Sequence, residues 1–286
     1  KYFPLFDQHG NLTNRFLLVS NICPNDPHVI IDGNERVVRS RLADAKFFFD
    51  QDRKKPLISR LPGLDTVIYH HQLGTQGLRV QYLCALANKI GAMIGGDQLA
   101  NEAAEAAKLA KTDLLTDMVG EFPELQGVMG CYYAQHEGLS DAIAYAIEDH
   151  YKPRYAGDVL PRNLVGVCVA LADKLETLVN LFAIGQIPTG DRDPYALRRH
   201  TLGIIRILIE KDLPVELDKL LELTFDIVQD EIIAQHWRQK MGNEHSVAIP
   251  LRPILTTELI EQLRRFISER LAGTLREQGY TAQEVD

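Results

Sequence analysis

The first sixty residues alternate between short apolar runs and loop signals. The apolar run at 16–20 has strand propensity and ends at a breaker segment, 23–27, that contains two prolines. Val29-Ile30-Ile31 leads into Asp32-Gly33-Asn34, which predicts a turn. From Glu35 onward apolar residues recur at helical spacing, so we expect a helix that runs to about Lys55, before Pro56.

Beyond the Leu61-Pro62-Gly63 break, nearly every segment has the period of a helix. One helix is expected over 78–94, up to a break at Gly95-Gly96, and further helices follow to the end of the chain. The expected ranges and signals are a helix from 97 to 118, a helix over 139–150, a helix opened by Pro161, a helix capped by Asp193-Pro194 and running to 211, a helix over 215–239, a polar loop over 242–247, and a last helix ended by Gly279. After Gly279 the pattern completes no further element.

The helix opened by Pro161 is the most informative one. A stripe of apolar residues runs from Leu164 to Phe182 at spacings of three and four, and the opposite face is small or apolar as well. A helix that is apolar nearly all round is buried at the centre of its domain. Asp173 interrupts this pattern on the face opposite the stripe, so we expect a buried carboxylate there.

Composition narrows the class of protein. The chain has 286 residues, a formal charge of −8, 45% hydrophobic and 24% charged residues, which is typical of an ordinary globular protein. It has no apolar stretch long enough for a membrane helix and no signal peptide. Four scattered cysteines without a C-x-x-C pair predict reduced thiols, no zinc site and a cytoplasmic location. The absent initiator methionine and the unfinished end predict a piece of a longer chain.

Histidines and aspartates on the expected helices suggest a degenerate metal site. Helical phosphohydrolases of the HD type bind a divalent cation with a histidine, a His-Asp pair and a later aspartate. This chain is similar in order and distances, with His70 and His71, then Lys111-Thr112-Asp113, then Asp173. A protonated lysine cannot ligate a metal. We therefore expect no metal here, with Asp113 and Asp173 structural and paired to Lys111 or Lys174, although vestigial metal binding by the histidines stays open.

Basic residues cluster in spite of the negative total charge. The segment from Glu35 to Arg60 holds eight basic and four acidic residues, a net charge of +4. Such clusters bind phosphate backbones without reading bases, although they are also found as solvated faces that pair with nearby carboxylates. The candidate contacts are Arg36, Arg39, Arg41 and Lys46, with Arg198 and Arg199 as a second patch.

Several long motifs together resemble one known family. They are KYFPL at 1–5, LTNRF at 12–16, VSNI at 19–22, RSRLADAKFF at 39–48, MVGEFPELQGVMG at 118–130, HYKPR at 150–154, AGD at 156–158, ALADKL at 170–175, PTG at 188–190 and DPYALRR at 193–199. With these motifs the chain resembles, over nearly its whole length, the β subunit of the bacterial, heterotetrameric glycyl-tRNA synthetase.

The resemblance implies a mainly α-helical fold in three parts. Residues 1–62 would be the end of an N-terminal β-containing region with a basic helix, 63–186 an HD-like helical domain with a degenerate metal site, and 187–286 a helical region that leads to a missing C-terminal anticodon-binding domain. The family's glycine and ATP site lies on its α subunit, which agrees with the absence of synthetase active-site motifs in this sequence.

The resemblance also implies partners and chemistry. The partners would be the α subunit, in an α2β2 assembly, and tRNA(Gly), with no membrane and no DNA. This piece would hold no catalytic residue and no cofactor of its own, while the complete enzyme uses ATP and Mg²⁺. Two alternatives are an HD-type metal-dependent phosphohydrolase and a non-catalytic helical scaffold that binds only protein. A chain of negative total charge can still bind RNA through a local basic face, because affinity depends on local phosphate contacts.

Overall fold

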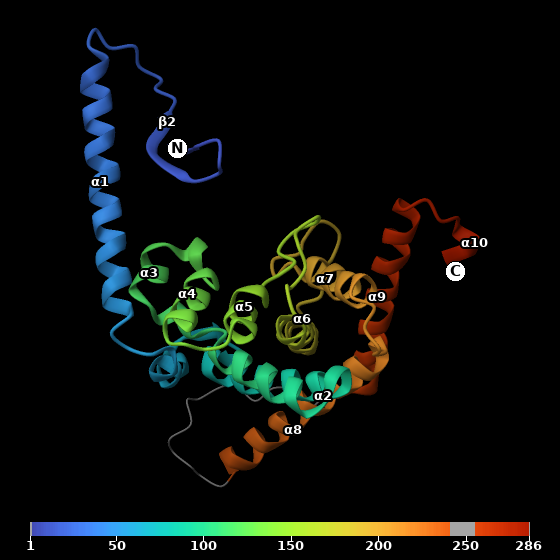
Figure 1. The fold of residues 1–286 in the computed structure, drawn as a ribbon. Helices are drawn as coiled ribbons and strands as arrows, with labels where there is room; N and C mark the ends of the chain where they lie inside the picture. Colours follow the sequence, from blue (N-terminus) through green and yellow to red (C-terminus); the bar gives the residue numbers. More distant parts are fainter. Residues whose placement is uncertain (1, 241–254, 286) are drawn as a thin grey trace. The chain divides into compact units, whose positions relative to one another are not determined.

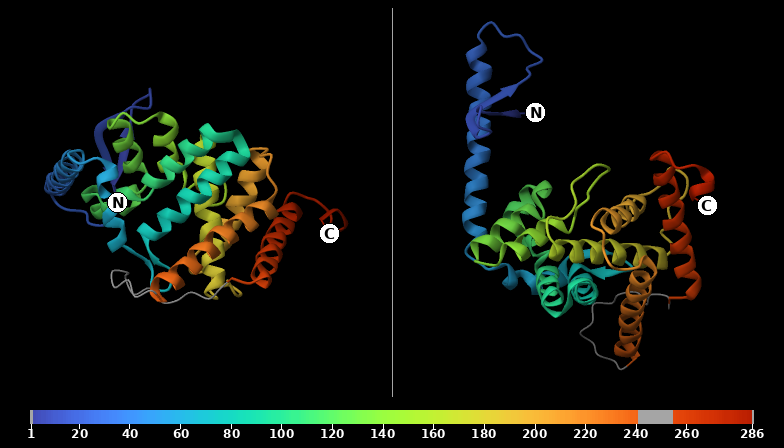
Figure 2. Two further views of the ribbon diagram at one scale, coloured as in Figure 1. Left: turned by 90° about the horizontal axis from the view of Figure 1, so that it is seen from below. Right: turned by 45° about the vertical axis from the view of Figure 1, so that its right-hand side comes forward.

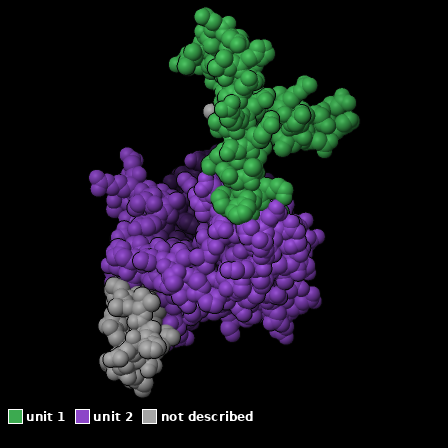
Figure 3. All heavy atoms as spheres, turned by 90° about the vertical axis from the view of Figure 1, so that its left-hand side faces the viewer, with its two compact units in different colours: residues 1–49 green, residues 50–286 purple. Residues whose placement is uncertain are grey.

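The computed structural model describes residues 2–240 and 255–285, except the side chains of 235–240. The loop expected over 242–247 lies outside this range. The described chain forms two compact units, Lys1–Phe49 and Asp50–Asp286, which are coloured separately in Figure 3. The mainly α-helical fold with a small preceding β segment is confirmed. The boundaries expected at residues 62 and 186 stay predictions.

The first unit consists of a hairpin and a long helix. Strands β1 (Tyr2–Phe6) and β2 (Leu12–Leu18) pair antiparallel, with Tyr2 opposite Leu18. Asp7 shapes the connecting turn, because its carboxylate accepts hydrogen bonds from the backbone N–H groups of His9 and Asn11. Helix α1 (Pro27–Asp52) follows and ends close to the expected position.

The turn predicted at Asp32-Gly33-Asn34 is wrong, since these residues lie inside α1. The helix begins at Pro27, and the Asp26 carboxylate accepts a hydrogen bond from the N–H of His28 in its first turn. The Asn34 side chain donates to the carbonyl of Ile30 and accepts from the hydroxyl of Tyr2. These contacts stabilise the helical conformation of Asp32-Gly33-Asn34, a tripeptide that locally favours a turn.

The second unit is built around α6 (Leu164–Ala183), in which every residue from 165 to 182 is buried. This confirms the central helix expected from its all-round apolar pattern. The helix starts after Asn163, whose side chain caps it by accepting from the N–H of Gly166, and thus slightly later than Pro161 predicted. Figures 1 and 2 show α6 in the middle of its neighbours, α2 (Gln76–Leu109), α5 (Asp141–Asp149), α7 (Leu197–Glu210), α8 (Leu217–Lys240) and α9 (Thr257–Glu277).

Helix α2 is two helical segments joined at a kink. Thr75 caps its start, and Gly96 has a φ of 78°, which confirms the break expected at Gly95-Gly96. The segments cross closely, since a Cβ on Gly91 would lie 2.7 Å from the Cα of Ala100. None of the described helices is long and apolar enough to cross a bilayer.

Short elements connect the long helices of this unit. They are the 3₁₀ helix η1 (Leu57–Thr66), strands β3 (Ile68–His70) and β4 (Gly74–Thr75), η2 (Thr112–Leu115), α3 (Asp117–Glu121), η3 (Pro123–Leu125) and α4 (Val128–His136). Asp52 organises the start of α3, because its carboxylate accepts from the N–H groups of Asp117 and Met118 and from the hydroxyl of Tyr133. The MVGEFPELQG motif therefore begins on a helix end that is held by a buried acid.

The C-terminal helices differ from expectation in two places. Helix α7 starts at Leu197 instead of Pro194, because Ala196 has a left-handed φ of 54° and Asp193 reaches past it to accept from the N–H groups of Leu197 and Arg198. Gly279, with a φ of 100°, follows the end of α9 as expected. A further short helix, α10 (Ala282–Val285), then forms where no element was expected.

Candidate functional site

A buried charge network occupies the position where the sequence suggested a degenerate metal site. Lys111, between α2 and η2, places its Nζ 2.9 Å from Oδ1 of Asp173 on α6. The same ammonium lies 2.7 Å from Nε2 of His150, at the end of α5. All three side chains are buried. Of the two pairings left open for Asp173, the structure shows the one with Lys111.

Arg79 on α2 completes the network and was missed by the sequence analysis. Its guanidinium donates to Asp173 at 3.1 Å, to Glu176 at 2.7 Å and to the hydroxyl of Thr177 at 2.7 Å. The guanidinium also lies over the ring of Tyr69, 4.3 Å from its centroid. A signal was present, since the mostly apolar helix carries two acids three residues apart, Asp173 and Glu176, against one cation, Lys174, so a further buried cation from another element is needed.

The electrostatics of the network follow from burial and pairing. Burial by itself would raise the pKa of Asp173, but the charges of Arg79 and Lys111 outweigh it and hold this pKa well below its usual range. Burial lowers the pKa of Lys111 to about 8, with Asp173 opposing the shift. Burial and the neighbouring Lys111 also keep the pKa of His150 well below its usual range, so the imidazole is neutral.

This protonation state assigns the hydrogen bonds of His150. Its Nδ1 lies 2.7 Å from the carbonyl of Ile147, which can only accept, so Nδ1 carries the proton. Nε2 is then free to accept from the ammonium of Lys111 at 2.7 Å. Lys111 thus takes up both the imidazole lone pair and the carboxylate that a divalent cation would need.

The residues present do not fit a metal ion at this position. A second cation would face the charges of Lys111 and Arg79 at the same carboxylate. Within residues 2–240 and 255–285, moreover, no group of three or more histidine, cysteine, aspartate or glutamate side chains is arranged to hold a metal.

The structure does not bring His70 and His71 into this network. Nε2 of His70 lies 3.1 Å from the hydroxyl of Tyr195, and its Nδ1 accepts from the N–H of Gln72. The ring of His71 stacks beside it at 4.3 Å and is exposed. His70 thus links the end of β3 to the segment around Tyr195.

Asp113 organises a neighbouring loop and, within the part of the chain that the structure describes, pairs with no lysine side chain at hydrogen-bond distance. Its Oδ2 accepts from the N–H groups of Gly127 and Gly130, whereas its buried Oδ1 has no hydrogen-bond partner among the described residues. Burial raises the pKa of Asp113 to about 6, against the lowering effect of these two N–H donors. The carboxyl thereby fixes the end of the MVGEFPELQG motif, where Gly127 has a φ of 80°.

The candidate RNA contacts of the first unit all lie on α1 and are exposed: Arg36, Arg39, Arg41 and Lys46. Arg36 and Arg39 are three residues apart, and Lys46 follows Arg39 by seven, so these three lie on one side of the helix. Arg41 points to another side. The three cations therefore share one side of α1, which also carries Asp32, Glu35 and Asp50, each four residues from one of them.

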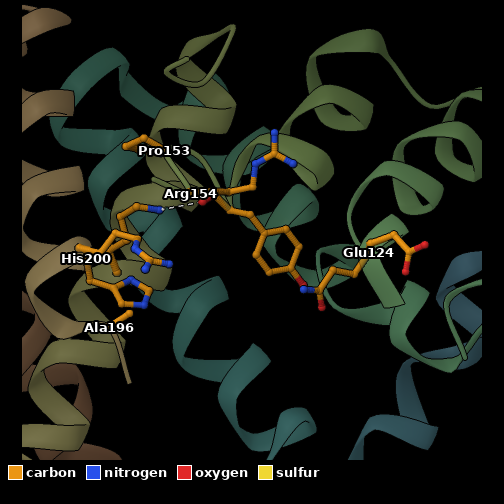
Figure 4. A pocket seen from close by; sticks show the side chains of 9 residues that line it. Glu124, Pro153, Arg154, Ala196 and His200 are labelled. Atoms are coloured by element: carbon orange, nitrogen blue, oxygen red, sulfur yellow. Dashed lines mark hydrogen bonds between the residues drawn. The ribbon is translucent and has the colours of Figure 1, made fainter. Parts of the chain in front are cut away.

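Arg198 and Arg199 have different surroundings. Arg198 donates to the carbonyl of Gly190 at 2.6 Å and closes the loop before α7. Arg199 is exposed and lines a cavity of about 320 Å³ together with Lys174 and His200, shown in Figure 4. Only Arg199 of this pair is therefore placed at a concave surface.

Comparisons with known proteins agree on one family. The family model described as glycyl-tRNA synthetase beta subunit matches residues 1–286. The chain is 64% identical over all of its length to the glycine–tRNA ligase beta subunits of Nitrosomonas europaea and Nitrosomonas eutropha, and covers 39% of each. It is 58% identical, again over all of its length, to that of Methylobacillus flagellatus, of which it covers 37%.

The chain thus spans about two fifths of the length of these relatives. The match runs through both units, from the hairpin and α1 to the helices packed around the Lys111–Asp173 network. Because the family model covers every residue, the chain belongs to the glycyl-tRNA synthetase beta subunit family.

Proposed function

We propose that the protein containing this chain is the β subunit of glycine–tRNA ligase. In this role it contributes tRNA binding and subunit assembly to the ATP-dependent attachment of glycine to tRNA(Gly). The amino-acid and ATP site, with its Mg²⁺, belongs to the α subunit of an α2β2 assembly in the cytoplasm. The observation that carries the proposal is the match of the family model along all 286 residues.

The buried network supports a structural role for the helical unit. Lys111 and Arg79 neutralise Asp173 and Glu176, and each carboxylate is within 3.1 Å of a cation. The ionised carboxylate of Asp173 is held by two cations and that of Glu176 by one, so neither is available as a general base or a metal ligand. The geometry thus gives no support to the phosphohydrolase alternative.

Helix α1 supports the part of the proposal that concerns RNA. Exposed Arg36, Arg39 and Lys46 form a row along one side of this helix. Exposed arginine and lysine side chains bind backbone phosphates of nucleic acids and release the counterions condensed on them. Recognition through shape and backbone is the usual mode for structured RNA.

The activity itself is tested by tRNA-dependent glycylation. Purified α subunit is assayed with ATP, Mg²⁺, glycine and tRNA(Gly), with and without the complete β chain. We expect glycyl-tRNA only when the β chain is present. Full glycylation by the α subunit alone would contradict the proposed contribution of the β subunit.

The RNA contact is tested with the double variant Arg36→Gln and Arg39→Gln in the complete β chain. tRNA affinity is measured at two salt concentrations. Two lost phosphate contacts should weaken binding and reduce the salt slope by about two. A matched control, Lys219→Gln with Arg265→Gln, removes the same charge from exposed positions on α8 and α9 and should bind as wild type. An unchanged salt dependence of tRNA affinity in the Arg36 and Arg39 double variant would refute the contact between this side of α1 and tRNA. If the wild-type β chain has no affinity for tRNA, the scaffold alternative is favoured.

A further inference from the structure

The second unit contains a cavity of about 320 Å³ that the proposed function does not use. Its walls come from the end of the MVGEFPELQG motif, from the segment after α5, from α6 and from the start of α7. Figure 4 shows Pro153, His200 and Ala196 on one side, Glu124 on the opposite side, and Arg154 between them. Lys174, Arg199, Tyr151 and Gln126 complete the lining.

Lys174 is the most unusual group in this lining. Its side chain is on the central helix α6 and the residue is only 2% exposed. Its Nζ has two contacts at the edge of hydrogen-bond distance, 3.4 Å to the carbonyl of His150 and 3.5 Å to that of Tyr151. Among the described residues no carboxylate lies within ion-pair distance of it. A buried ammonium with three donors and only two distant acceptors lacks a strong anionic partner.

The protein nevertheless holds Lys174 in one place. A Cβ on Gly203 of α7 would lie 2.8 Å from the Cε of Lys174, so the absence of a side chain at this position makes room for the lysine stem. Burial lowers the pKa of Lys174 to about 8, and the lysine is therefore still protonated at neutral pH. The ammonium is thus a positioned cation at the wall of a cavity.

The neighbouring groups on this side can also donate. Arg199 is exposed in the first turn of α7. Burial lowers the pKa of His200 to about 4, so its imidazole is neutral, and its buried Nδ1, which has no hydrogen-bond partner among the described residues, donates in the tautomer that carries its proton there. Arg154 lies between the two sides, where Asp158 orients its Nε at 3.2 Å. The lining acid, Glu124, stands on the opposite side of the cavity. The Lys174 side therefore combines two cations with an unsatisfied imidazole and no lining carboxylate.

We infer that this cavity binds the phosphate group of a nucleotide, with Lys174, Arg199 and His200 as its donors. Charge-assisted hydrogen bonds from an ammonium and a guanidinium are the usual protein partners of phosphate oxygens. The volume is at the lower end for small-molecule sites and exceeds what a lone phosphate fills. The remainder of the ligand reaches towards Gln126 and Glu124, whose amide and carboxylate pair with hydroxyl or amino groups.

A nucleotide phosphate has two possible sources, a free mononucleotide and a phosphate of bound RNA. The second source rests on the proposed function, whereas the first does not. The experiment uses the complete β chain without the α subunit, because the proposed function places another adenine-nucleotide site on the α subunit. Binding of AMP and of inorganic phosphate is measured by calorimetry, and the β chain is assayed as wild type, Lys174→Met, Arg199→Gln and the control Arg265→Gln.

We expect saturable AMP binding by wild type and the control, and an affinity at least about tenfold lower in each pocket variant, as the loss of one charge-assisted hydrogen bond implies. Arg199 is exposed, so its variant keeps the test valid even where Lys174→Met impairs folding. Absence of saturable binding of AMP and phosphate up to about 10 mM would overturn the inference. Wild-type affinity in the Arg199→Gln variant would also overturn it.

Competition identifies the source. Displacement of AMP by tRNA assigns the pocket to an RNA phosphate, and AMP that stays bound at saturating tRNA assigns it to a free nucleotide; both support the site. The two proposals fail separately. If the pocket variants lose AMP binding but the Arg36 and Arg39 double variant keeps its affinity for tRNA, only the α1 face is refuted. If the double variant loses tRNA affinity but the pocket variants keep their AMP affinity, only the pocket is refuted.

Discussion

Replacement of Arg79 by Met is expected to destabilise the second unit strongly. In the folded chain Arg79 and Lys111 balance Asp173 and Glu176, and all four side chains are buried. The variant leaves Lys111 alone with two buried carboxylates and removes four hydrogen bonds. Removing one partner of a buried ion pair costs about 3–5 kcal/mol, out of a stability of about 5–15 kcal/mol for a typical domain.

The assay is urea denaturation followed by helical circular dichroism, together with hydrogen exchange of the α6 amides as a local measure. A second variant tests the reasoning. Adding Glu176→Gln to Arg79→Met removes the unpaired charge and keeps an oxygen that can accept from Asn180, which bonds Glu176 at 2.8 Å. The double variant should therefore be more stable than Arg79→Met alone, by about 1–2 kcal/mol.

Arg264→Met provides a matched control. Arg264 on α9 also contacts several carboxylates, Asp218, Glu222 and Glu261, but the pairs lie at the surface. Solvent screens such pairs, so this variant should change stability little. Equal losses in the Arg79 and Arg264 variants, or a double variant no more stable than Arg79→Met, would refute the argument that burial makes the network important.

Three further variants test the core of the second unit. Gly130→Ala would place a Cβ 2.6 Å from Cγ2 of Ile147, and the overpacking should cost about 1–3 kcal/mol in urea denaturation; no measurable loss would contradict the packing described. Burial raises the pKa of Asp113 to about 6 from 3.8, so the folded chain binds a proton more tightly than the unfolded one, and stability should fall by up to about 3 kcal/mol as pH rises from 4 to 6. The Asp113→Asn variant should not show this fall of stability with pH. An identical dependence of stability on pH in the variant and the wild type would show that Asp113 does not cause it. Asp52→Ala removes the acceptor of the Met118 N–H, so the exchange of that amide should accelerate and stability should drop by about 2–3 kcal/mol, while an unchanged exchange rate would refute the capping role.

Local signals allowed some elements to be predicted well. The all-round apolar pattern of α6 and the glycines at 96 and 279 report backbone and burial preferences that act over one or two helical turns. The same locality explains the errors. Asp32-Gly33-Asn34 reads as a turn, yet Tyr2, far away in the sequence, contacts Asn34 within the helix.

The candidate site was predictable only in part. Asp173 stood out because a carboxylate in an apolar helix needs a partner. That Asp173 pairs with Lys111 and not with Lys174 depends on the directions of side chains around α6. The role of Arg79 depends on its contact with Asp173, which lies 94 positions away in the sequence. Spacing along one helix carries no information about the facing helix.

By itself, the sequence determined the helical character of the chain, its buried central helix and, through long motifs, its family. These properties follow from periodicity and residue type, which are local or additive along the chain. Only the tertiary structure decided that Lys111 lies between Asp173 and His150, and that Lys174 lines a cavity with no carboxylate of the described residues within ion-pair distance. The reason is physical: the charge state and the partners of a buried group depend on distances and desolvation, which are set by packing between elements distant in sequence.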